Sequence, residues 1–378
     1  GYYYIDVTLP GAPDGTFYGG VGFQVASYRP PEFEVTASSA EPEYLQGETA
    51  TFEIDAAYFS GGPLADSPVD WRLVASPYTF VWQNAPDGRY FSFQPYDPDD
   101  FNFDPYRYTY YGGLIQEGTG VTDENGALTV DLPTELDGSP TSQNWRFAAT
   151  VQSSTNQFVN DAISVPVHRA EFVIGLSPRR SVTRVGEESI VDVVTLEALG
   201  SPDNAPYPDA ELDVTIYEFV WNSVYAKTAG GAFRWENEVQ RTPVYSTTVT
   251  TDAAGTGEII WSPERGGQYQ IEASGVDGAG NEVSSATYVW AAGGDEPVAW
   301  RRENHDRIEL VADKALYQPG ESAQILVPNP FSGQVDALVT IERDGVIESQ
   351  IVTLEKSDEL LDIPITSEHI PNIYVSVV

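Results

Sequence analysis

The sequence contains no cysteine. Among its 378 residues none is Cys, so this chain holds no disulfide, thiol nucleophile or thiolate metal ligand. Methionine is absent too, and the chain begins with Gly1. We therefore expect an interior piece of a longer protein, or a mature piece whose ends are missing. Elements that decide the function are then expected outside the piece.

Basic residues are scarce. The 19 Lys and Arg stand against 57 Asp and Glu, and the formal net charge is -38. Such a field repels nucleic acid and anionic membranes, so we expect no nucleic-acid partner and interpret the charge as a solvated acidic coat. The sequence also lacks an apolar run long enough to span a membrane and an N-terminal signal pattern. The absence of Asn-x-Ser/Thr sequons favours a bacterial source over a glycosylated eukaryotic one.

Glycine and proline are plentiful, at 33 and 27 residues, and leave little room for long helices. Between them lie short segments rich in Val, Thr, Tyr and Phe, which are typical of strands. Turn signals about every 8–12 residues predict an all-β fold, a tandem row of antiparallel β-sandwiches of the immunoglobulin or fibronectin-III-like kind. The length suits about three such domains.

A short pattern occurs three times. A hydrophobic residue precedes a Gly-Glu pair by one to three positions, and β-rich sequence follows. The pairs begin at Gly47, Gly186 and Gly320, a spacing near the size of one sandwich domain. Around the third pair, the alternating run 307–312 and a second run from Ser322 predict two paired antiparallel strands.

These breaks predict the domain organisation. A double proline, Pro30-Pro31, stiffens the first junction. The composition of residues 291–297 predicts a flexible linker at the last one. We expect the last strands of a preceding domain in 1–29, a sandwich with an insert at 76–113 in 30–168, a second sandwich in 169–293 and a third in 294–378.

Alternation and turn residues also predict individual strands in the first sandwich. The pair Asn125-Gly126 predicts a tight hairpin, and 251–255 repeats that turn in the second sandwich. The predicted strands are at about 50–58, 69–75, 115–121, 127–132, 145–152 and 161–168.

The insert is dense in Asp, Tyr and Phe. Asp97, Asp99, Asp100 and Asp104 offer hard oxygen ligands of the kind that calcium prefers. The Gly and terminal Glu of an EF-hand loop are missing, however. The simpler alternative is a long surface loop whose aromatic side packs on its own sandwich.

The tyrosines of the insert allow three interpretations. They could form a sugar-binding platform, cover a sheet face or contact a neighbouring domain. We favour the domain contact, which makes the insert a spacer that fixes the angle between domains. The tyrosines concerned are Tyr106, Tyr108, Tyr110 and Tyr111.

No catalytic constellation stands out. The three histidines, His168, His305 and His369, are far apart in sequence, and neither His-Glu-x-x-His nor Gly-x-Ser-x-Gly occurs. Carboxylates abound, but an acid–base pair needs a close geometry that abundance does not supply. We therefore predict no enzyme and no cofactor. Asp277 and Asn281 are interpreted as turn formers.

Arg301, Arg302, His305 and Arg307 form the most basic cluster of the chain. We expect these interdomain residues to clasp acidic residues of a neighbouring domain. Exposed ion pairs contribute about 0–1 kcal/mol each, so the cluster is expected to tune domain orientation rather than hold the fold.

Seven stretches, in order along nearly the whole chain, resemble bacterial alpha-2-macroglobulin-like proteins. The best match is Trp300 to Asn304 together with Ser322 to Phe331. The other stretches are 28–35 (YRPPEFEV), 58–65 (YFSGGPLA), 167–172 (VHRAEF), 220–224 (VWNSV) and 242–245 (TPVY).

The resemblance implies macroglobulin-like sandwiches, with the three complete ones counted as third, fourth and fifth. Members of the family trap endopeptidases: a protease cuts an exposed bait region, the molecule rearranges around it, and many members attach it through a Cys-Gly-Glu-Gln thioester. The resemblance therefore implies a structural segment that works with trapped endopeptidases and with other domains of the same protein. It also implies a location outside the cytoplasm, in the periplasm, anchored to the cell envelope or secreted.

Under this resemblance the bait region and any thioester are expected past Val378. The alternative is an immunoglobulin-like cell-surface or adhesive spacer that does not trap proteases. A glycan-binding module, suggested only by the aromatic insert, ranks below both.

Overall fold

The computed structural model describes residues 2–7, 19–24, 30–86, 89–96, 113–136, 139–200, 204–227, 231, 233–304, 307–331 and 333–378. Within these ranges strands dominate and no α-helix occurs, and η2 (Ser367–His369) is a single 3-10 turn. This confirms the predicted all-β fold. None of the described segments forms a helix of the length and hydropathy needed to cross a membrane.

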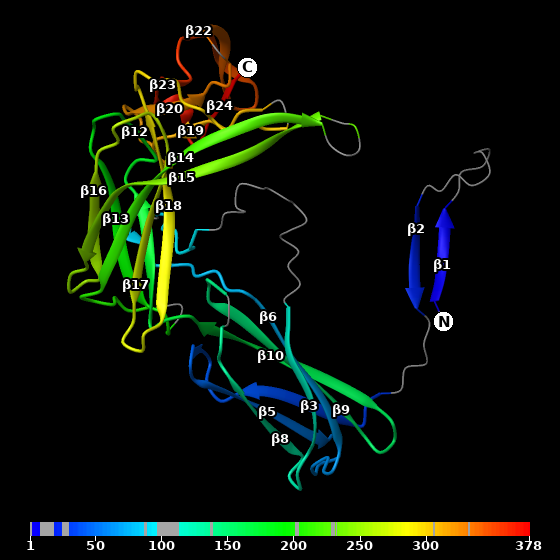
Figure 1. The fold of residues 1–378 in the computed structure, drawn as a ribbon. Helices are drawn as coiled ribbons and strands as arrows, with labels where there is room; N and C mark the ends of the chain where they lie inside the picture. Colours follow the sequence, from blue (N-terminus) through cyan, green and yellow to red (C-terminus); the bar gives the residue numbers. More distant parts are fainter. Residues whose placement is uncertain are drawn as a thin grey trace.

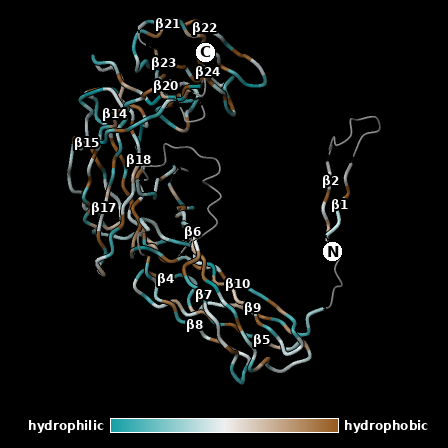
Figure 2. Tube along the Cα trace, turned by 45° about the vertical axis from the view of Figure 1, so that its right-hand side comes forward, coloured by the Kyte–Doolittle hydropathy of each residue, from teal (hydrophilic) through white to brown (hydrophobic). Residues whose placement is uncertain are grey.

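The strands build three β-sandwiches that follow one another in a curved row (Figures 1 and 2). Each has its own buried apolar core. Because apolar and polar residues alternate along the strands, one face of each sheet turns inward, as β3 (Phe33–Ser39) illustrates with its alternating buried and exposed side chains. A separate hairpin near the N-terminus pairs β1 (Tyr2–Val7) with β2 (Gly19–Gln24).

The first sandwich packs the sheet β4-β10-β9-β6-β7 on the sheet β3-β5-β8. Its core centres on Trp145 and on the stacked rings of Phe52 and Phe147, whose centroids are 4.5 Å apart. The observed strands agree with the predicted ones to within a few residues. Their bounds are β4 (Tyr44–Leu45), β5 (Thr49–Tyr58), β6 (Pro68–Pro77), β7 (Gly113–Val121), β8 (Ala127–Pro133), β9 (Gln143–Gln152) and β10 (Phe158–His168).

The second sandwich packs the sheet β11-β13-β16 on the sheet β12-β18-β17-β14-β15. Two of its strands are much longer than the rest, at 17 and 18 residues, and project as a hairpin toward the third sandwich (Figure 1). The bounds are β11 (Phe172–Pro178), β12 (Val182–Arg184), β13 (Ser189–Glu197), β14 (Glu211–Lys227), β15 (Phe233–Thr250), β16 (Thr256–Trp261), β17 (Gly267–Val276) and β18 (Glu282–Ala292).

The third sandwich is smaller and packs the sheet β19-β20-β23 on the sheet β22-β21-β24. Its core includes Ile325, Val327, Val339 and Ile363. The bounds are β19 (Val311–Ala312), β20 (Ser322–Pro328), β21 (Val335–Glu342), β22 (Val346–Leu354), β23 (Asp358–Pro364) and β24 (Tyr374–Val377).

The three Gly-Glu pairs occupy equivalent turns. Gly47, Gly186 and Gly320 all have positive φ, at 91°, 81° and 99°, where glycine is favoured because it has no Cβ. Each of these glycines donates its N–H to a carbonyl of a distant strand end, and the glutamate N–H that follows bonds back three residues. The repeated sequence pattern therefore marks a repeated structural turn.

One local prediction is wrong, and a second is confirmed only in part. The turn at Asn125-Gly126 does not close a hairpin, because β7 pairs with β6 and β8 pairs with β5 in the opposite sheet. Gly126 has a positive φ of 81°, and a Cβ there would lie 2.4 Å from the Ala56 carbonyl oxygen of β5, its neighbour in the same sheet, so the backbone conformation and this close approach require the glycine. The run 307–312 pairs antiparallel with the strand from Ser322, as predicted, but only Val311–Ala312 form the paired strand.

Candidate interdomain site

The predicted calcium ligands Asp97, Asp99, Asp100 and Asp104 lie outside the described residues. In the part of the chain that the structure describes, no three His, Cys, Asp or Glu side chains gather so as to hold a metal ion. Calcium binding by the insert therefore stays a prediction. Tyr106, Tyr108, Tyr110 and Tyr111 also lie outside the described residues.

The described histidines are far apart in the fold as well as in the sequence. His168 ends β10 in the first sandwich and is fully buried. His369 lies in η2 of the third sandwich, where its Nδ1 accepts the Thr366 N–H at 3.3 Å. His305 lies outside the described residues. The two described histidines thus form no common proton-transfer site.

The first half of the insert, residues 78–86 and 89–96, lies on the second sandwich, and we call it the strap. Its aromatic rings pack against one another and against buried apolar side chains of β11 and β13. Phe80 and Phe93, for example, have ring centroids 4.7 Å apart. This cluster comprises Tyr78, Phe80, Trp82, Phe91 and Phe93 of the strap with Val173, Val194, Leu196 and Ala198 of the second sandwich.

Backbone hydrogen bonds tie the strap to both sheets of the second sandwich. Ser92 and Leu176 exchange two N–H···O bonds, of 2.8 and 2.9 Å, at the free edge of β11. In the other sheet, the Ala286 N–H donates to the Gln94 carbonyl at 2.8 Å. The strap therefore covers an edge strand that would otherwise expose unpaired backbone groups.

A charged cluster fastens the strap from outside. Arg89 Nη1 lies 2.6 Å from Asp192 Oδ2, and Arg179 also binds this carboxylate, at 2.8 Å. Burial alone would raise the pKa of Asp192, but the hydrogen bonds from Arg179 and Arg89 outweigh it and hold the pKa below its ordinary value. The strap thus contacts a neighbouring domain, as favoured above for the insert. For the four tyrosines on which that preference was argued, it stays a prediction.

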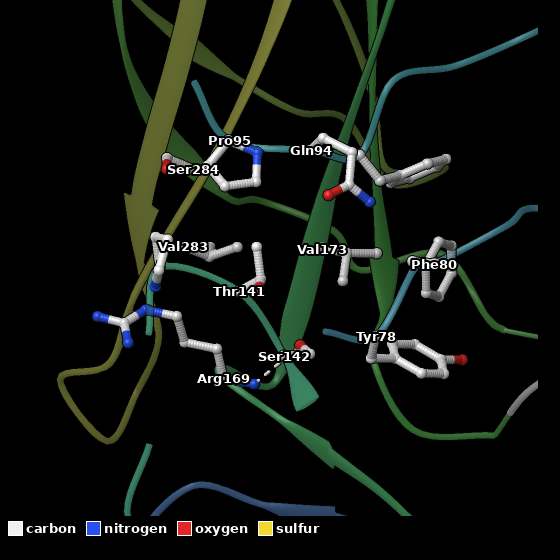
Figure 3. A pocket seen from close by; sticks show the side chains of 12 residues that line it. Tyr78, Phe80, Gln94, Pro95, Thr141, Ser142, Arg169, Val173, Val283 and Ser284 are labelled. Carbon is white, nitrogen blue, oxygen red and sulfur yellow. Dashed lines mark hydrogen bonds between the residues drawn. The ribbon is translucent and has the colours of Figure 1, made fainter. Parts of the chain in front are cut away.

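A small cavity of about 30 Å³ lies where the strap meets the junction of the first and second sandwiches (Figure 3). Arg169 lines it and spans the junction, because Nε donates to the Glu282 carbonyl at 2.8 Å and Nη1 donates to the Ser139 carbonyl at 2.7 Å. The volume suits a water molecule and is far below that of a small-molecule pocket, about 300–1,000 Å³. The region is therefore a joint between sandwiches rather than a ligand site.

The second joint is the linker 293–304, which a turn of the third sandwich holds. Asp358 Oδ2 accepts the Gly293 N–H, and Ser357 Oγ accepts the Val298 N–H, both at 2.7 Å. Trp300 donates its indole N–H to the Ser357 carbonyl at 2.5 Å. The linker is thus fixed by specific contacts, which its glycine-rich composition did not predict.

Apolar side chains from both sandwiches reinforce this second joint. Val182 and Ala292 of the second sandwich, Trp300 of the linker and Leu326 of the third sandwich form a small buried cluster. Ala292 is at the end of β18, so the linker begins later than its composition suggested. The joint therefore has a hydrophobic core of its own.

The linker then runs along the outer part of the β14–β15 hairpin, residues 219–227 and 233–241, which we call the arm. The guanidinium carbon of Arg301 lies 5.7 Å from the ring centroid of Trp221, and that of Arg302 lies 5.5 Å from the ring centroid of Trp235. Such cation–π contacts contribute about 0.5–1 kcal/mol each when exposed. The ion pair of Arg301, at 2.7 Å, is with Glu303 of the same linker.

Arg301 and Arg302 therefore contact aromatic rings of the neighbouring sandwich. Arg307 is exposed, and His305 lies outside the described residues. A role of this cluster in setting the domain angle stays a prediction.

Asn304 binds the arm as a neighbouring strand would. Its Oδ1 accepts the Trp235 N–H at 2.6 Å, and its Nδ2 donates to the Trp235 carbonyl at 3.0 Å. Two residues earlier, the Arg302 carbonyl accepts a bond from Asn237 Nδ2 at 2.9 Å. The linker is thereby held in register with the arm.

Profiles of known families match the two sandwiches on either side of this linker. The profile described as bacterial macroglobulin domain 6 matches residues 175–293, and that described as alpha-2-macroglobulin bait region domain matches residues 308–378. The chain belongs to the bacterial alpha-2-macroglobulin family. The predicted resemblance is thereby confirmed.

Relatives in the family are much longer than this chain. The alpha-2-macroglobulin homolog of Nostoc sp. is 21% identical over 94% of the chain and 18% of its own length. The alpha-2-macroglobulin of Pasteurella multocida is 22% identical over 92% of the chain and 17% of its own length. A solved structure of native E. coli alpha-2-macroglobulin is 16% identical over 97% of the chain and 24% of its own, with a TM-score of 0.49.

Two expectations about the alpha-2-macroglobulin domains are wrong. The bait region domain begins inside the chain, at residue 308, and not past Val378. The second sandwich, counted above as the fourth, matches domain 6. Alternation and turn residues predict a sandwich without distinguishing one macroglobulin domain from another, so the sequence pattern could not number them.

The sequence reasoning also missed residues that build the joints. Ser92 had a signal, since it lies between Phe91 and Phe93 in an alternating run that indicates a strand. Ser357 and Asp358 had none, because their partners are about 60 residues away in sequence.

Proposed function

We propose that this chain is a structural segment of a bacterial alpha-2-macroglobulin that traps and inhibits endopeptidases. In this proposal the sandwiches carry no catalytic group. The third sandwich, from residue 294, contributes the beginning of the bait region domain, and the second sandwich holds it in place. The partners are the trapped endopeptidases and the remaining domains of the same protein.

One observation carries the proposal. The sandwich that matches the bait region domain is joined to its neighbour by a linker that is hydrogen-bonded at both ends, to Ser357 and Asp358 on one side and to Trp235 on the other. A fixed joint would transmit a conformational change in the bait region domain to the other sandwiches, whereas a flexible linker would let that domain move without displacing them. We place the domain boundaries of the framework at 1–29, 30–168, 169–293 and 294–378.

The test uses the full-length protein that contains this chain. We expect incubation with an active endopeptidase to leave hydrolysis of a small peptide substrate intact, while cleavage of a large protein substrate falls several-fold. A captured protease keeps its active site but is screened from large substrates by the surrounding domains. The measurement is the ratio of the two activities over a titration of the full-length protein.

The matched control is the same protease blocked covalently at its active site. It cannot cut, so it should remain free in size-exclusion chromatography. If the active protease degrades the protein with no change in the activity ratio, or does not react with it, trapping is refuted. That outcome would support the alternative, an adhesive or cell-surface spacer. A location in the periplasm, on the cell envelope or outside the cell belongs to the same proposal and is checked by cell fractionation.

A further inference from the structure

The joint between the first and second sandwiches contains a buried histidine. His168 is fully buried at the last position of β10, immediately before the chain enters the second sandwich. Among the described residues neither of its ring nitrogens has a hydrogen-bond partner. The ring of Tyr78, from the strap, meets it edge-on with centroids 5.3 Å apart. An imidazole in such a place is accommodated as a neutral, largely apolar ring.

Among the described residues, the carboxylate of Glu43 faces this imidazole. Glu43 Oε2 lies 3.7 Å from His168 Nε2, too far for a hydrogen bond but close enough for an electrostatic interaction. The same oxygen accepts the N–H of Gly200, in the second sandwich, at 2.9 Å. Glu43 therefore links the first sandwich to the second while it stands next to the buried histidine.

Other charged and titratable groups near the end of β10 have different partners. Arg169 is turned to the Glu282 and Ser139 carbonyls. Glu48, beyond β4, accepts the Leu45 N–H at 2.7 Å. In the second sandwich, Glu171 accepts a hydrogen bond from the Tyr207 hydroxyl at 3.4 Å. In the part of the chain that the structure describes, Glu43 is thus the carboxylate placed to respond to the charge of His168.

We propose that this joint is an acid-sensitive hinge, which stays closed while His168 is neutral and loosens when His168 takes up a proton. A proton on either ring nitrogen places a cation in a fully buried site, where the Glu43 carboxylate at 3.7 Å lies beyond hydrogen-bond distance. The free-energy cost of this buried positive charge is lowered in one of two ways: the joint opens to solvent, or Glu43 moves toward the ring. Either change breaks the Glu43–Gly200 bond between the sandwiches. This inference goes beyond the trap and does not depend on it.

The direction of the pH response follows from the burial. Burial lowers the pKa of His168 below its ordinary value of 6.5, and the nearby carboxylate of Glu43 offsets only part of this. The open joint, in which the ring meets water, therefore binds the proton more tightly than the closed joint. Acidification below about pH 6.5 therefore shifts the equilibrium toward the open joint. The ratio of open to closed joints rises by at most about tenfold for each unit by which the pKa of His168 in the open joint exceeds its pKa in the closed joint. The effect levels off below the pKa of the closed state.

The experiment measures the angle of the joint by single-molecule energy transfer between dyes on the two sandwiches. The chain has no cysteine of its own, so Ser154→Cys and Thr248→Cys, both at exposed positions, give one dye on each sandwich. We expect one population at pH 7.5 and a second, more open population that grows between pH 6.5 and 5. Far-UV circular dichroism at each pH checks that the sandwiches stay folded.

The decisive variant is His168→Phe, which keeps a buried ring but cannot titrate. We expect it to remain in one population over the whole pH range. His369→Phe is the matched control, since it removes a histidine of the third sandwich, and it should respond as the unmodified chain does. If His168→Phe does not fold, His168→Gln takes its place. A pH response that persists in the folded His168 variant, or a response absent from the unmodified chain, overturns the hinge.

Discussion

Replacing Trp300 with alanine should uncouple the third sandwich from the second. The side chain is 9% exposed and lies in the small core with Val182, Ala292 and Leu326. Removing an indole from such a site costs about 3–5 kcal/mol, because the apolar contacts are lost and the space does not fully collapse. This is a large fraction of the stability of a small domain.

Trp300→Phe separates packing from hydrogen bonding. The variant keeps most of the ring and loses only the indole N–H. The Ser357 carbonyl that this group binds also accepts the Asn329 N–H at 2.9 Å, so it is not left unpaired. The expected loss from the missing bond is therefore about 0.5–1.5 kcal/mol, well below that of the alanine variant.

The assay is calorimetric unfolding of the chain. In Trp300→Ala we expect the transition of the third sandwich to separate from the rest and to move down by more than about 10 °C. Phe331→Ala is the control, because Phe331 belongs to the same sandwich but is 65% exposed, and its loss should cost less than about 0.5 kcal/mol. Equal shifts in Trp300→Ala and Phe331→Ala would show that this core does not hold the joint.

Three further predictions concern the same interdomain contacts. Gly175→Ala would bring a Cβ to 2.7 Å from the Phe93 ring, so it should weaken the packing of the strap by about 1–3 kcal/mol. Proteolysis within residues 78–96 should then be faster than in the unmodified chain, and an unchanged rate of cleavage would contradict the prediction. Burial alone would raise the pKa of the Asp277 carboxyl, but the hydrogen bonds that it accepts outweigh burial and lower the pKa. The ionised carboxylate therefore stabilises the fold above its ordinary pKa near 4, and this stabilisation is lost as the pH falls below that value. Asp277→Asn should be less stable than the unmodified chain at pH 7, and the difference in unfolding free energy should shrink toward pH 3 rather than stay constant. Asn304→Ala removes both bonds to Trp235 and should accelerate exchange of the Trp235 amide hydrogen at least several-fold, whereas equal exchange would mean that the linker does not hold the arm.

Much of the fold could be predicted from short-range pattern. Alternation of apolar and polar residues placed the strands of the first sandwich to within a few residues, because the period of two is a local property of a half-buried strand. The Gly-Glu pairs marked equivalent turns, since positive φ is a local requirement that glycine meets. Where the pattern was ambiguous, as at Asn125-Gly126, the pairing of strands across two sheets decided the outcome.

The candidate site could be predicted only in part. The basic linker and the aromatic insert were identified as places where domains meet. Their partners were not identified, because the choice between an acidic side chain and a ring such as Trp221 depends on which strand lies opposite. Neither Glu43 nor Ser357 had any distinguishing sequence signal, since a hydrogen bond across a joint joins residues that are distant in the chain.

By itself the sequence determined the fold class, the absence of cysteine, the strongly negative net charge and the family. These follow from composition, from local periodicity and from stretches short enough to be read without knowing the fold. Only the tertiary structure decided how the sandwiches are joined: the strap on β11, the indole of Trp300 under the third sandwich, and the buried His168 beside Glu43. These contacts depend on the relative position of whole sheets, and that position results from packing over the entire interface, not from any one segment.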